Sequence, residues 1–315
     1  MPEAFRRGSF LSLSNGGFHR LAYLDWGKAS SEHAVLCVHG LSRNSRDFDY
    51  LARELAPHCR VVCMDVVGRG DSEWLADKSE YTFSTYLNDA AMMIARITAP
   101  PAPNFFGTFR DRGKTVNGSA RLDWVGTSMG GLIGMLLAAK RGSPIRRLVL
   151  NDVGPFIPWG ALYRLKGHVA SGTAFRSPLE VEAYLREACA PFGPLEDEHW
   201  RHLAEHSAAP TGEGGYRLRY DPAIGDALRA GQPDPEFPLG PNVLAGIDLW
   251  SVWSRIRCPT LVLRGAESDV LSRKTLRRMQ AVRSGVEMLE LSGVGHAPAL
   301  MSKDQISAIR DFLLR

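Results

Sequence analysis

A serine lies between two glycines in the stretch Gly126-Thr127-Ser128-Met129-Gly130, directly after a mostly apolar run. A serine hydroxyl is a poor nucleophile at its ordinary pKa, so it needs a neighbouring base to take its proton. A histidine can serve as that base, and a carboxylate on its other ring nitrogen fixes the tautomer and stabilises the imidazolium. Because Gly-x-Ser-x-Gly is a weak pattern by itself, its meaning depends on what the fold brings to Ser128.

Short apolar runs alternate with helical patterns along most of the chain. Nearly continuous Val, Leu and Ile residues are typical of parallel strands that are buried on both faces. Such runs predict strands at residues 33–40, 60–68, 121–128, 146–154 and 259–265, and a last strand is predicted at residues 286–293. Apolar residues spaced by three and four predict helices at residues 46–56, 84–97, 130–140 and 303–315. This alternation predicts an α/β fold with a mostly parallel central sheet and helices on both faces.

Two further segments complete the predicted organisation. Residues 9–27 have the pattern of a hairpin that turns at residues 15–17, which predicts an antiparallel edge on the sheet. Residues 155–250 separate two predicted strands with mostly helical or irregular sequence, which is too long for a simple crossover. We therefore expect a core made of residues 1–154 and 251–315, with residues 155–250 forming a cap sub-domain over one end of the sheet. Residues 99–120 are rich in Pro, Gly and polar residues and predict a long loop of undefined role.

Chemistry-bearing residues follow the predicted strands at the points where the strands end. In open α/β sheets, ligands bind beyond the carboxyl ends of the strands. These positions carry the following residues in chain order: His39-Gly40, Gly68-Arg69-Gly70-Asp71-Ser72, Ser128, Asp269 and Gly295-His296. A serine, an aspartate and a histidine are therefore expected at the same end of one sheet.

This ordered set of motifs resembles the α/β-hydrolase fold family, and in particular its capped serine hydrolases of the esterase or lactonase type. The resemblance covers roughly residues 9–154 and 250–315. It implies a nucleophile elbow at Ser128 and a catalytic triad completed by Asp269 and His296. Some family members instead keep the acid after the strand that follows the nucleophile helix, which makes Asp152 the alternative acid.

An oxyanion hole is the remaining requirement of acyl transfer. The backbone N–H of Met129 is expected at a helix N-terminus, where unpaired N–H groups and the helix dipole favour an anion. The family resemblance implies that the second donor is the backbone N–H of Leu41. We expect His39 to hold the oxyanion loop rather than act as a second base, and Asp65 and Asp71 to shape their own loop.

The predicted function is hydrolysis of a carboxylic ester or lactone of a small, fairly apolar acid through an acyl-enzyme on Ser128. One alternative on the same fold is a carbon–carbon bond hydrolase of aromatic ring-cleavage products. Its usual tryptophan after the catalytic histidine is replaced here by Ala297. A cofactor-free haloperoxidase or perhydrolase, an acyltransferase and a non-catalytic ligand receptor are further alternatives.

Composition excludes several other classes of function. A formal net charge of +4, without a run of basic residues, does not suit a nucleic-acid-binding protein. The chain contains no apolar run of about 18 residues or more and no secretory signal pattern, so neither a membrane nor secretion is expected. The five cysteines lack CxxC spacing, which favours a reducing, cytoplasmic setting. No cofactor and no metal are predicted, the expected partner is the small-molecule ester or lactone substrate, and the oligomeric state stays open.

Overall fold

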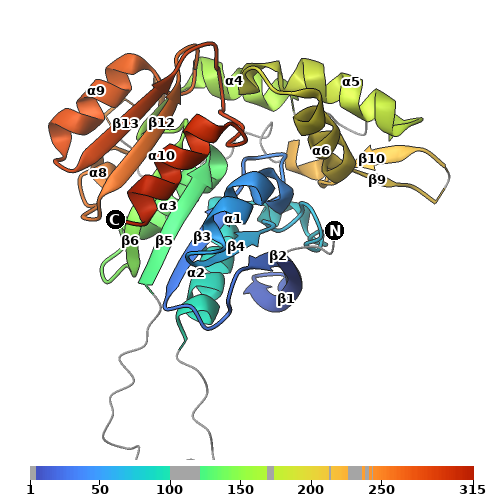
Figure 1. Ribbon diagram of the computed structural model, residues 1–315, viewed down its shortest axis with the longest axis horizontal. Helices are drawn as coiled ribbons and strands as arrows, with labels where there is room; N and C mark the ends of the chain where they lie inside the picture. Colours follow the sequence, from blue (N-terminus) through green and yellow to red (C-terminus); the bar gives the residue numbers. More distant parts are fainter. Residues whose placement is uncertain are drawn as a thin grey trace, which may run out of the picture.

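The computed structural model describes residues 5–99, 121–168, 174–212, 214–225, 236–237, 241–242 and 244–315, with side chains described outside residues 166–168. The predicted loop at residues 99–120 lies outside this part of the chain from residue 100 onward. One sheet of eight strands forms the centre of the molecule, in the order β1-β2-β4-β3-β5-β6-β12-β13 (Figure 1). Its strands are β1 (Phe5–Ser14), β2 (Gly17–Trp26), β3 (His33–Val38), β4 (Arg60–Met64), β5 (Arg121–Thr127), β6 (Ile145–Asn151), β12 (Thr260–Gly265) and β13 (Val286–Leu291).

The inner strands run parallel and are almost entirely buried. Every residue of β3 and β12 is buried, as the continuous apolar runs predict for strands covered on both faces. The edge strand β13 instead consists of half-buried and exposed residues. The predicted hairpin is confirmed: β1 pairs antiparallel with β2, and β2 pairs antiparallel with β4.

Helices cover both faces of the sheet. One face packs an apolar cluster against α1 and α10, and the other packs a larger cluster against α2, α3, α8 and α9. The helices are α1 (Asp49–Leu55), α2 (Phe83–Thr98), α3 (Met129–Ala138), α8 (Trp250–Trp253), α9 (Arg273–Val282) and α10 (Lys303–Leu313), with 3-10 turns η1 (Ser45–Phe48) and η2 (Lys78–Glu80). The α/β architecture that the sequence predicted is therefore confirmed.

The segment between β6 and α8 lies outside the central sheet; we call residues 155–250 the inserted segment. Its first and last strands, β7 (Phe156–Pro158) and β11 (Gly246–Asp248), pair antiparallel with each other. Between them lie α4 (Trp159–His168), β8 (Ala174–Phe175), α5 (Pro178–Ala188), η4 (Ala190–Phe192), α6 (Asp197–Ser207), β9 (Ala208–Pro210) and β10 (Tyr216–Leu218). Figure 1 shows α4, α5 and α6 lying across one end of the sheet.

The inserted segment has a small apolar cluster of its own. Val181 and Leu185 of α5 pack with Trp200 and Leu203 of α6. Ala299 and Met301 from the loop before α10 join the same cluster, so the inserted segment shares part of its apolar packing with the core. Among the described residues, no helix combines the length and the apolar character that crossing a bilayer requires.

Candidate active site

Ser128 stands at a sharp turn between β5 and α3. Its backbone has φ 51° and ψ −113°, in the left-handed half of φ space that residues with a side chain rarely adopt. A Cβ on Gly130 would overlap the backbone of Val38 at the end of β3, and one on Gly126 would overlap the backbone of Gly130. The two glycines therefore let the turn close against β3, which holds the Ser128 side chain above the end of the sheet.

The structure brings Ser128, His296 and Asp152 together. His296 Nε2 lies 2.8 Å from Ser128 Oγ, and His296 Nδ1 lies 2.7 Å from Asp152 Oδ2. Because a carboxylate only accepts hydrogen bonds, Nδ1 carries the proton in this contact, and the lone pair of Nε2 faces the serine hydroxyl. This is the arrangement in which the imidazole can take the hydroxyl proton.

Asp152 is held by groups from the end of β12, the loop directly after it and the histidine loop. Its Oδ1 accepts a hydrogen bond from Gly265 N at 2.9 Å, and its Oδ2 accepts one from Ser268 Oγ at 2.6 Å in addition to the one from His296. Asp152 is fully buried and has a φ of 55°, a second left-handed residue at a strand end. A buried carboxylate that accepts this many bonds has one orientation open to it, so it fixes the ring of His296.

The preferred acid of the sequence prediction, Asp269, does not contact His296. Its carboxylate instead accepts two hydrogen bonds from Arg164 on α4: Oδ2 accepts from Nε and Oδ1 accepts from Nη2, each at 2.6 Å. Partial burial acts to raise the pKa of this carboxyl, but the hydrogen bond and charge of Arg164 outweigh burial and lower it. The preference for Asp269 is thus corrected to the alternative, Asp152: the loops after β6 and β12 both lie beside the histidine loop, but His296 Nδ1 contacts Asp152, whereas the Asp269 carboxylate pairs with Arg164.

A second contact ties the histidine loop to the elbow. Asn151, the last residue of β6, donates from Nδ2 to Pro298 O at 2.8 Å and to Thr127 Oγ1 at 3.1 Å, and its carbonyl accepts from Ser128 N at 3.0 Å. Asn151 is fully buried. It therefore fixes the elbow and the loop that carries His296 relative to each other.

The structure also shows how the predicted oxyanion loop is held. His39 is fully buried; its Nε2 accepts from Val66 N at 3.0 Å, so its Nδ1 carries the proton and donates to Gly40 O at 2.7 Å. The Gly40 carbonyl and the Leu41 N–H belong to one trans peptide and point in opposite directions. Anchoring that carbonyl therefore sets the direction of the Leu41 N–H. Burial lowers the pKa of His39 to about 4, which keeps it neutral in this role.

Met129 is the first residue of α3, where backbone N–H groups have no acceptor within the helix. The Cβ position of Gly40 lies 3.8 Å from Ser128 Cβ, so the loop that carries Leu41 runs beside the elbow. The residues that carry the two predicted donors, Leu41 and Met129, thus belong to two elements beside the serine, and their role as an oxyanion hole stays a prediction.

The loop after β4 is shaped by Asp65 as expected, whereas Asp71 has another role. Asp65 accepts hydrogen bonds from Ser45 N at 2.7 Å and Asp71 N at 2.9 Å, and burial raises the pKa of this carboxyl to about 6. The Asp71 side chain instead forms ion pairs with Arg7 and Arg219.

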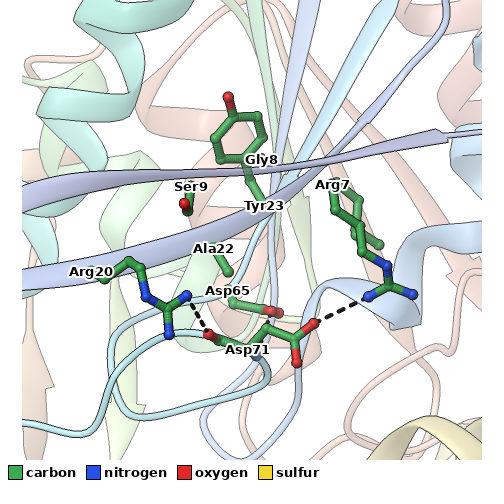
Figure 2. A pocket seen from close by; sticks show the side chains of 9 residues that line it. Arg7, Gly8, Ser9, Arg20, Ala22, Tyr23, Asp65 and Asp71 are labelled. Atoms are coloured by element: carbon green, nitrogen blue, oxygen red, sulfur yellow. Dashed lines mark hydrogen bonds and ion pairs between the residues drawn. The ribbon is translucent and has the colours of Figure 1, made fainter.

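A cavity of about 390 Å³ lies between the β1–β2 hairpin and this loop. Figure 2 shows Asp71 in this cavity, hydrogen bonded to Arg7 through its carboxylate and to Arg20 through its backbone carbonyl. None of the residues that line the cavity belongs to the Ser128 site. Arg7 pairs with the Asp71 carboxylate, Arg20 donates to the Asp71 carbonyl, and Asp65 accepts from backbone N–H groups, so the charged groups of this cavity have partners within the protein.

One cluster in the described residues has the residue types of a metal site. Ligand atoms of Asp49, His202 and His206 lie within 4.8 Å of one another. Arg46 occupies Asp49 Oδ2 at 2.6 Å, and His202 Nε2 contacts the Arg46 carbonyl at 3.0 Å. Burial, followed by the charge of Arg46, lowers the pKa of His206 to about 3. This positive surrounding disfavours a cation, so the cluster joins α1 to α6 as a polar contact.

Three residues of the site had no role in the sequence-based prediction: Asn151, which ties the histidine loop to the elbow, Ser268 and Arg69. Ser268 donates to Asp152, and Arg69 contacts Leu41 O through Nε at 2.9 Å. Arg69 is the middle residue of Gly68-Arg69-Gly70, within a motif that the sequence does display. Ser268 carries no signal, because a serine beside a strand end is common in turns.

Comparison with known proteins identifies the family of the chain. The sequence profile of the alpha/beta hydrolase family matches residues 35–309. The chain is 38% identical to the 3-hydroxybutyrate-oligomer hydrolase of Cupriavidus necator over 99% of both chains. It is 25% identical to the 2-(acetamidomethylene)succinate hydrolase of Mesorhizobium japonicum, over 89% of this chain and 87% of that one.

Solved structures show the same fold over the same length. An alpha/beta hydrolase from Novosphingobium aromaticivorans is 32% identical and superposes with a TM-score of 0.79, and a protein from Rickettsia typhi is 29% identical with a TM-score of 0.82. Each match covers 98% of both chains. The chain belongs to the alpha/beta hydrolase family and is a hydrolase.

Proposed function

We propose that this hydrolase cleaves carboxylic esters through an acyl-enzyme on Ser128. The observation that carries the proposal is the continuous chain of contacts from Ser128 Oγ through His296 to Asp152. Each residue takes the role its contact allows: Ser128 attacks, His296 moves the proton, and Asp152 orients and stabilises the imidazolium.

The proposed reaction has two halves. Ser128 Oγ forms a bond to the ester carbonyl carbon while its proton passes to His296 Nε2, and the carbonyl oxygen becomes an anion between the N–H groups of Leu41 and Met129. The carbon–oxygen bond to the leaving group then breaks, and His296 returns the proton to the departing alcohol. Water attacks the acyl-enzyme in the second half with His296 again as base, which releases the acid and restores Ser128.

For the substrate, we propose short linear oligoesters of a small hydroxy acid of the 3-hydroxybutyrate type. Support comes from the relative named for such oligomers, whose 38% identity extends over nearly the whole of both chains. An oligoester of this kind is small and fairly apolar, which agrees with the expectation from the sequence. Each cleavage would yield one alcohol and one carboxylate, as the two-step reaction requires.

We further propose that the inserted segment is a lid over the site. Gly295, the residue before His296, donates from its N–H to Pro191 O of the inserted segment at 2.7 Å. Arg164 of α4 pairs with Asp269, which follows Ser268 in the chain. These contacts support a binding space between the core and the inserted segment, a common place for small-molecule sites.

The experiment is hydrolysis of 3-hydroxybutyrate dimer and trimer, followed by chromatography of the released acid, with wild type, Ser128→Ala and Ser251→Ala. Ser251 is an exposed serine of α8 and serves as the matched control. We expect Ser128→Ala to lose at least roughly 10⁴-fold in kcat with unchanged thermal unfolding, and Ser251→Ala to behave as wild type. A fluorophosphonate label should appear by mass spectrometry on the peptide that contains Ser128.

Near-normal turnover by Ser128→Ala would place the nucleophile elsewhere. If the protein cleaved p-nitrophenyl butyrate rapidly but did not cleave the 3-hydroxybutyrate dimer and trimer, the proposed oligoester substrate would be contradicted. The proposed acyl-enzyme mechanism would stand. A single burst of nitrophenol without further turnover would contradict the enzyme and favour a ligand receptor.

A further inference from the structure

Arg69 is a fully buried arginine at the oxyanion hole. Its exposed fraction is 0%, and it follows β4 in the loop that also carries Asp65. In the part of the chain that the structure describes, no carboxylate lies within ion-pair distance of its guanidinium. Two other buried arginines differ in this respect: Arg43 pairs with Asp47 at 2.6 Å, and Arg264 pairs with Glu290 at 2.8 Å.

Neutral groups satisfy most of the Arg69 hydrogen-bond donors. Nε donates to Leu41 O at 2.9 Å, and Nη1 donates to Val67 O at 2.7 Å and to Tyr86 Oη at 3.0 Å. The rings of Tyr86 and Tyr81 lie under the guanidinium, with centroids 4.9 and 5.8 Å away. Such contacts offset the desolvation of a cation without placing a carboxylate directly on it; the Asp221 carboxylate lies one side chain away, where it accepts from Tyr81 Oη at 2.7 Å.

The position of this charge gives it a use. Arg69 holds the carbonyl of Leu41, and its Nη2 lies 3.7 Å from Sδ of Met129, a weak acceptor. Leu41 and Met129 are the two residues whose N–H groups are the predicted oxyanion donors. The guanidinium therefore contacts both residues that carry the proposed oxyanion donors, one through its carbonyl and the other through its side-chain sulfur.

We propose that Arg69 is a positioning residue for ester cleavage: it fixes Leu41 through its carbonyl and supplies the buried positive charge that stabilises the oxyanion. The inference rests on the proposed function of Ser128. A charge that is already desolvated and held in place acts on a developing anion without screening by water. It contributes little to binding a neutral ester, so its effect belongs in kcat and not in KM.

The experiment compares Arg69→Met, which removes the charge at similar length, with Arg69→Lys, which keeps it. We expect Arg69→Met to lose about 10- to 100-fold in kcat with KM within about twofold, somewhat less than the loss of a direct oxyanion donor. Affinity for a trifluoromethyl ketone, which forms an anionic adduct with the serine, should fall by the same factor as kcat/KM. Arg69→Lys should keep more of both activities near neutral pH.

A pH profile separates the charge from a structural role. A lysine buried at this position has its pKa lowered by desolvation, so Arg69→Lys should lose activity and ketone affinity above neutral pH. Wild type should lack this extra basic limb, because arginine stays protonated. The titratable groups around residue 69 are His39 after β3, Tyr81 after η2, Tyr86 of α2 and Tyr220, which forms a β-bridge with residue 69, while the Asp221 carboxylate lies behind Tyr81 and accepts from its hydroxyl. All of them are unchanged in the variant.

Tyr86→Phe is the matched control, because it removes one acceptor of Arg69 and leaves the charge. We expect its kcat and ketone affinity within about threefold of wild type. If circular dichroism shows that Arg69→Met does not fold, the test rests on Arg69→Lys alone: the loss of its activity and ketone affinity above neutral pH decides whether the charge matters.

Three results would overturn the role of Arg69: wild-type kcat in folded Arg69→Met, an equal loss in Tyr86→Phe, or no basic limb in folded Arg69→Lys. These differ from failure of the proposed function, in which Ser128→Ala keeps its turnover and wild type takes no phosphonate label on Ser128.

Discussion

Asp152 and Asp269 are two carboxylates at neighbouring strand ends with opposite surroundings. Asp152 is fully buried and accepts hydrogen bonds from Gly265, Ser268 and His296. The side chain of Asp269 is 47% exposed and pairs with Arg164. An exposed ion pair is worth little, whereas a buried carboxylate with three donors determines the orientation of each of them.

We predict that Asp152→Asn is severe and Asp269→Asn is mild. An asparagine at 152 turns one acceptor into a donor, so His296 loses the partner that fixes its tautomer, and kcat should fall roughly 10³- to 10⁴-fold. Asp269→Asn loses only the Arg164 pair and should stay within about fivefold of wild type. Steady-state kinetics with a p-nitrophenyl ester measures both, and thermal unfolding checks that each variant is folded.

Equal losses in the two variants would contradict this assignment, and the reverse order would restore Asp269 as the acid.

The choice between the two acids shows what the sequence can predict at this scale. Ser128 and His296 lie in loops with recognisable glycine patterns. Both loops follow predicted strands of one parallel sheet, so the sequence predicted that the two side chains meet. Both aspartates also follow a strand, and β6 and β12 are neighbours in the sheet. Which carboxylate faces the imidazole depends on how the loop from Leu291 to Ala299 crosses the two strand ends, and no local pattern encodes that path. Arg69 stands in a motif that the sequence displays, but its role could not be predicted because it depends on the two residues that Arg69 contacts.

At the scale of elements, the elbow is the junction on which the site depends. Ser128 has no side-chain capping bond to α3, so the helix begins without the usual capping stabilisation. The close approach of Gly130 to Val38 and the bonds of Asn151 to Thr127 and Pro298 hold the turn instead. Packing between α3, β3 and β6 therefore keeps Ser128 in its left-handed conformation.

We predict that Gly130→Ala destabilises the protein by about 1–3 kcal/mol and displaces Ser128, because the new methyl group overlaps the backbone of Val38. Phosphonate labelling of Ser128 should slow in the fraction that remains folded. Gly160→Ala in α4 is the control, since nothing lies within 4 Å of its Cβ position. Its stability should be unchanged or raised by up to about 1 kcal/mol.

Urea unfolding followed by tryptophan fluorescence gives the stabilities. A Gly130→Ala variant as stable as wild type would show that α3 can shift away from β3 without cost.

Elements with strong local patterns were predictable, and those that depend on their neighbours were not. The buried strands and the hairpin were expected within a few residues, because their apolar runs and the turn at residues 15–17 are local signals. The helix α9 had no prediction, since its buried face is narrow: three buried residues, Thr275, Leu276 and Met279, stand among exposed basic ones. The ribbon of β7 and β11 joins residues about 90 apart, a pairing that local periodicity does not contain.

At the scale of the whole molecule, polar contacts bind the inserted segment to the loops of the core. Asn44 Nδ2 donates to His206 O at 2.8 Å, Arg43 Nη1 donates to Ser207 Oγ at 3.0 Å, and Gly70 N donates to Arg219 O at 2.7 Å. Several of these core residues lie close to buried titratable groups, namely His39 near Arg43 and Asp65 near Gly70. Acidification therefore changes the protonation of groups in the same loops that hold the site and contact the inserted segment.

Two of these groups have opposite effects on stability as the pH falls. The folded-state pKa of His39 is lowered to about 4, so the unfolded chain binds its proton first, and this residue costs about 3 kcal/mol between pH 6.5 and 4. His206, whose pKa is lowered to about 3, acts in the same direction. The folded-state pKa of Asp65 is raised to about 6, so the folded chain binds its proton first and gains about 3 kcal/mol between pH 6 and 3.8.

We predict that replacing either residue reveals the effect of the other on how the free energy of unfolding changes with pH. Asp65→Asn should lose more stability than wild type on going from pH 6.5 to 4, because the gain from protonating residue 65 is gone. His39→Gln should lose less than wild type over the same window, because its side chain no longer takes up a proton on unfolding. Urea unfolding at pH 4, 5, 6.5 and 7.5 gives the free energy of unfolding of each variant, and only the slope with pH is compared, since both substitutions also alter hydrogen bonds. Parallel slopes in all three proteins would mean that neither side chain changes its proton affinity on folding, and the neutral state assigned to His39 at the oxyanion loop would lose its basis.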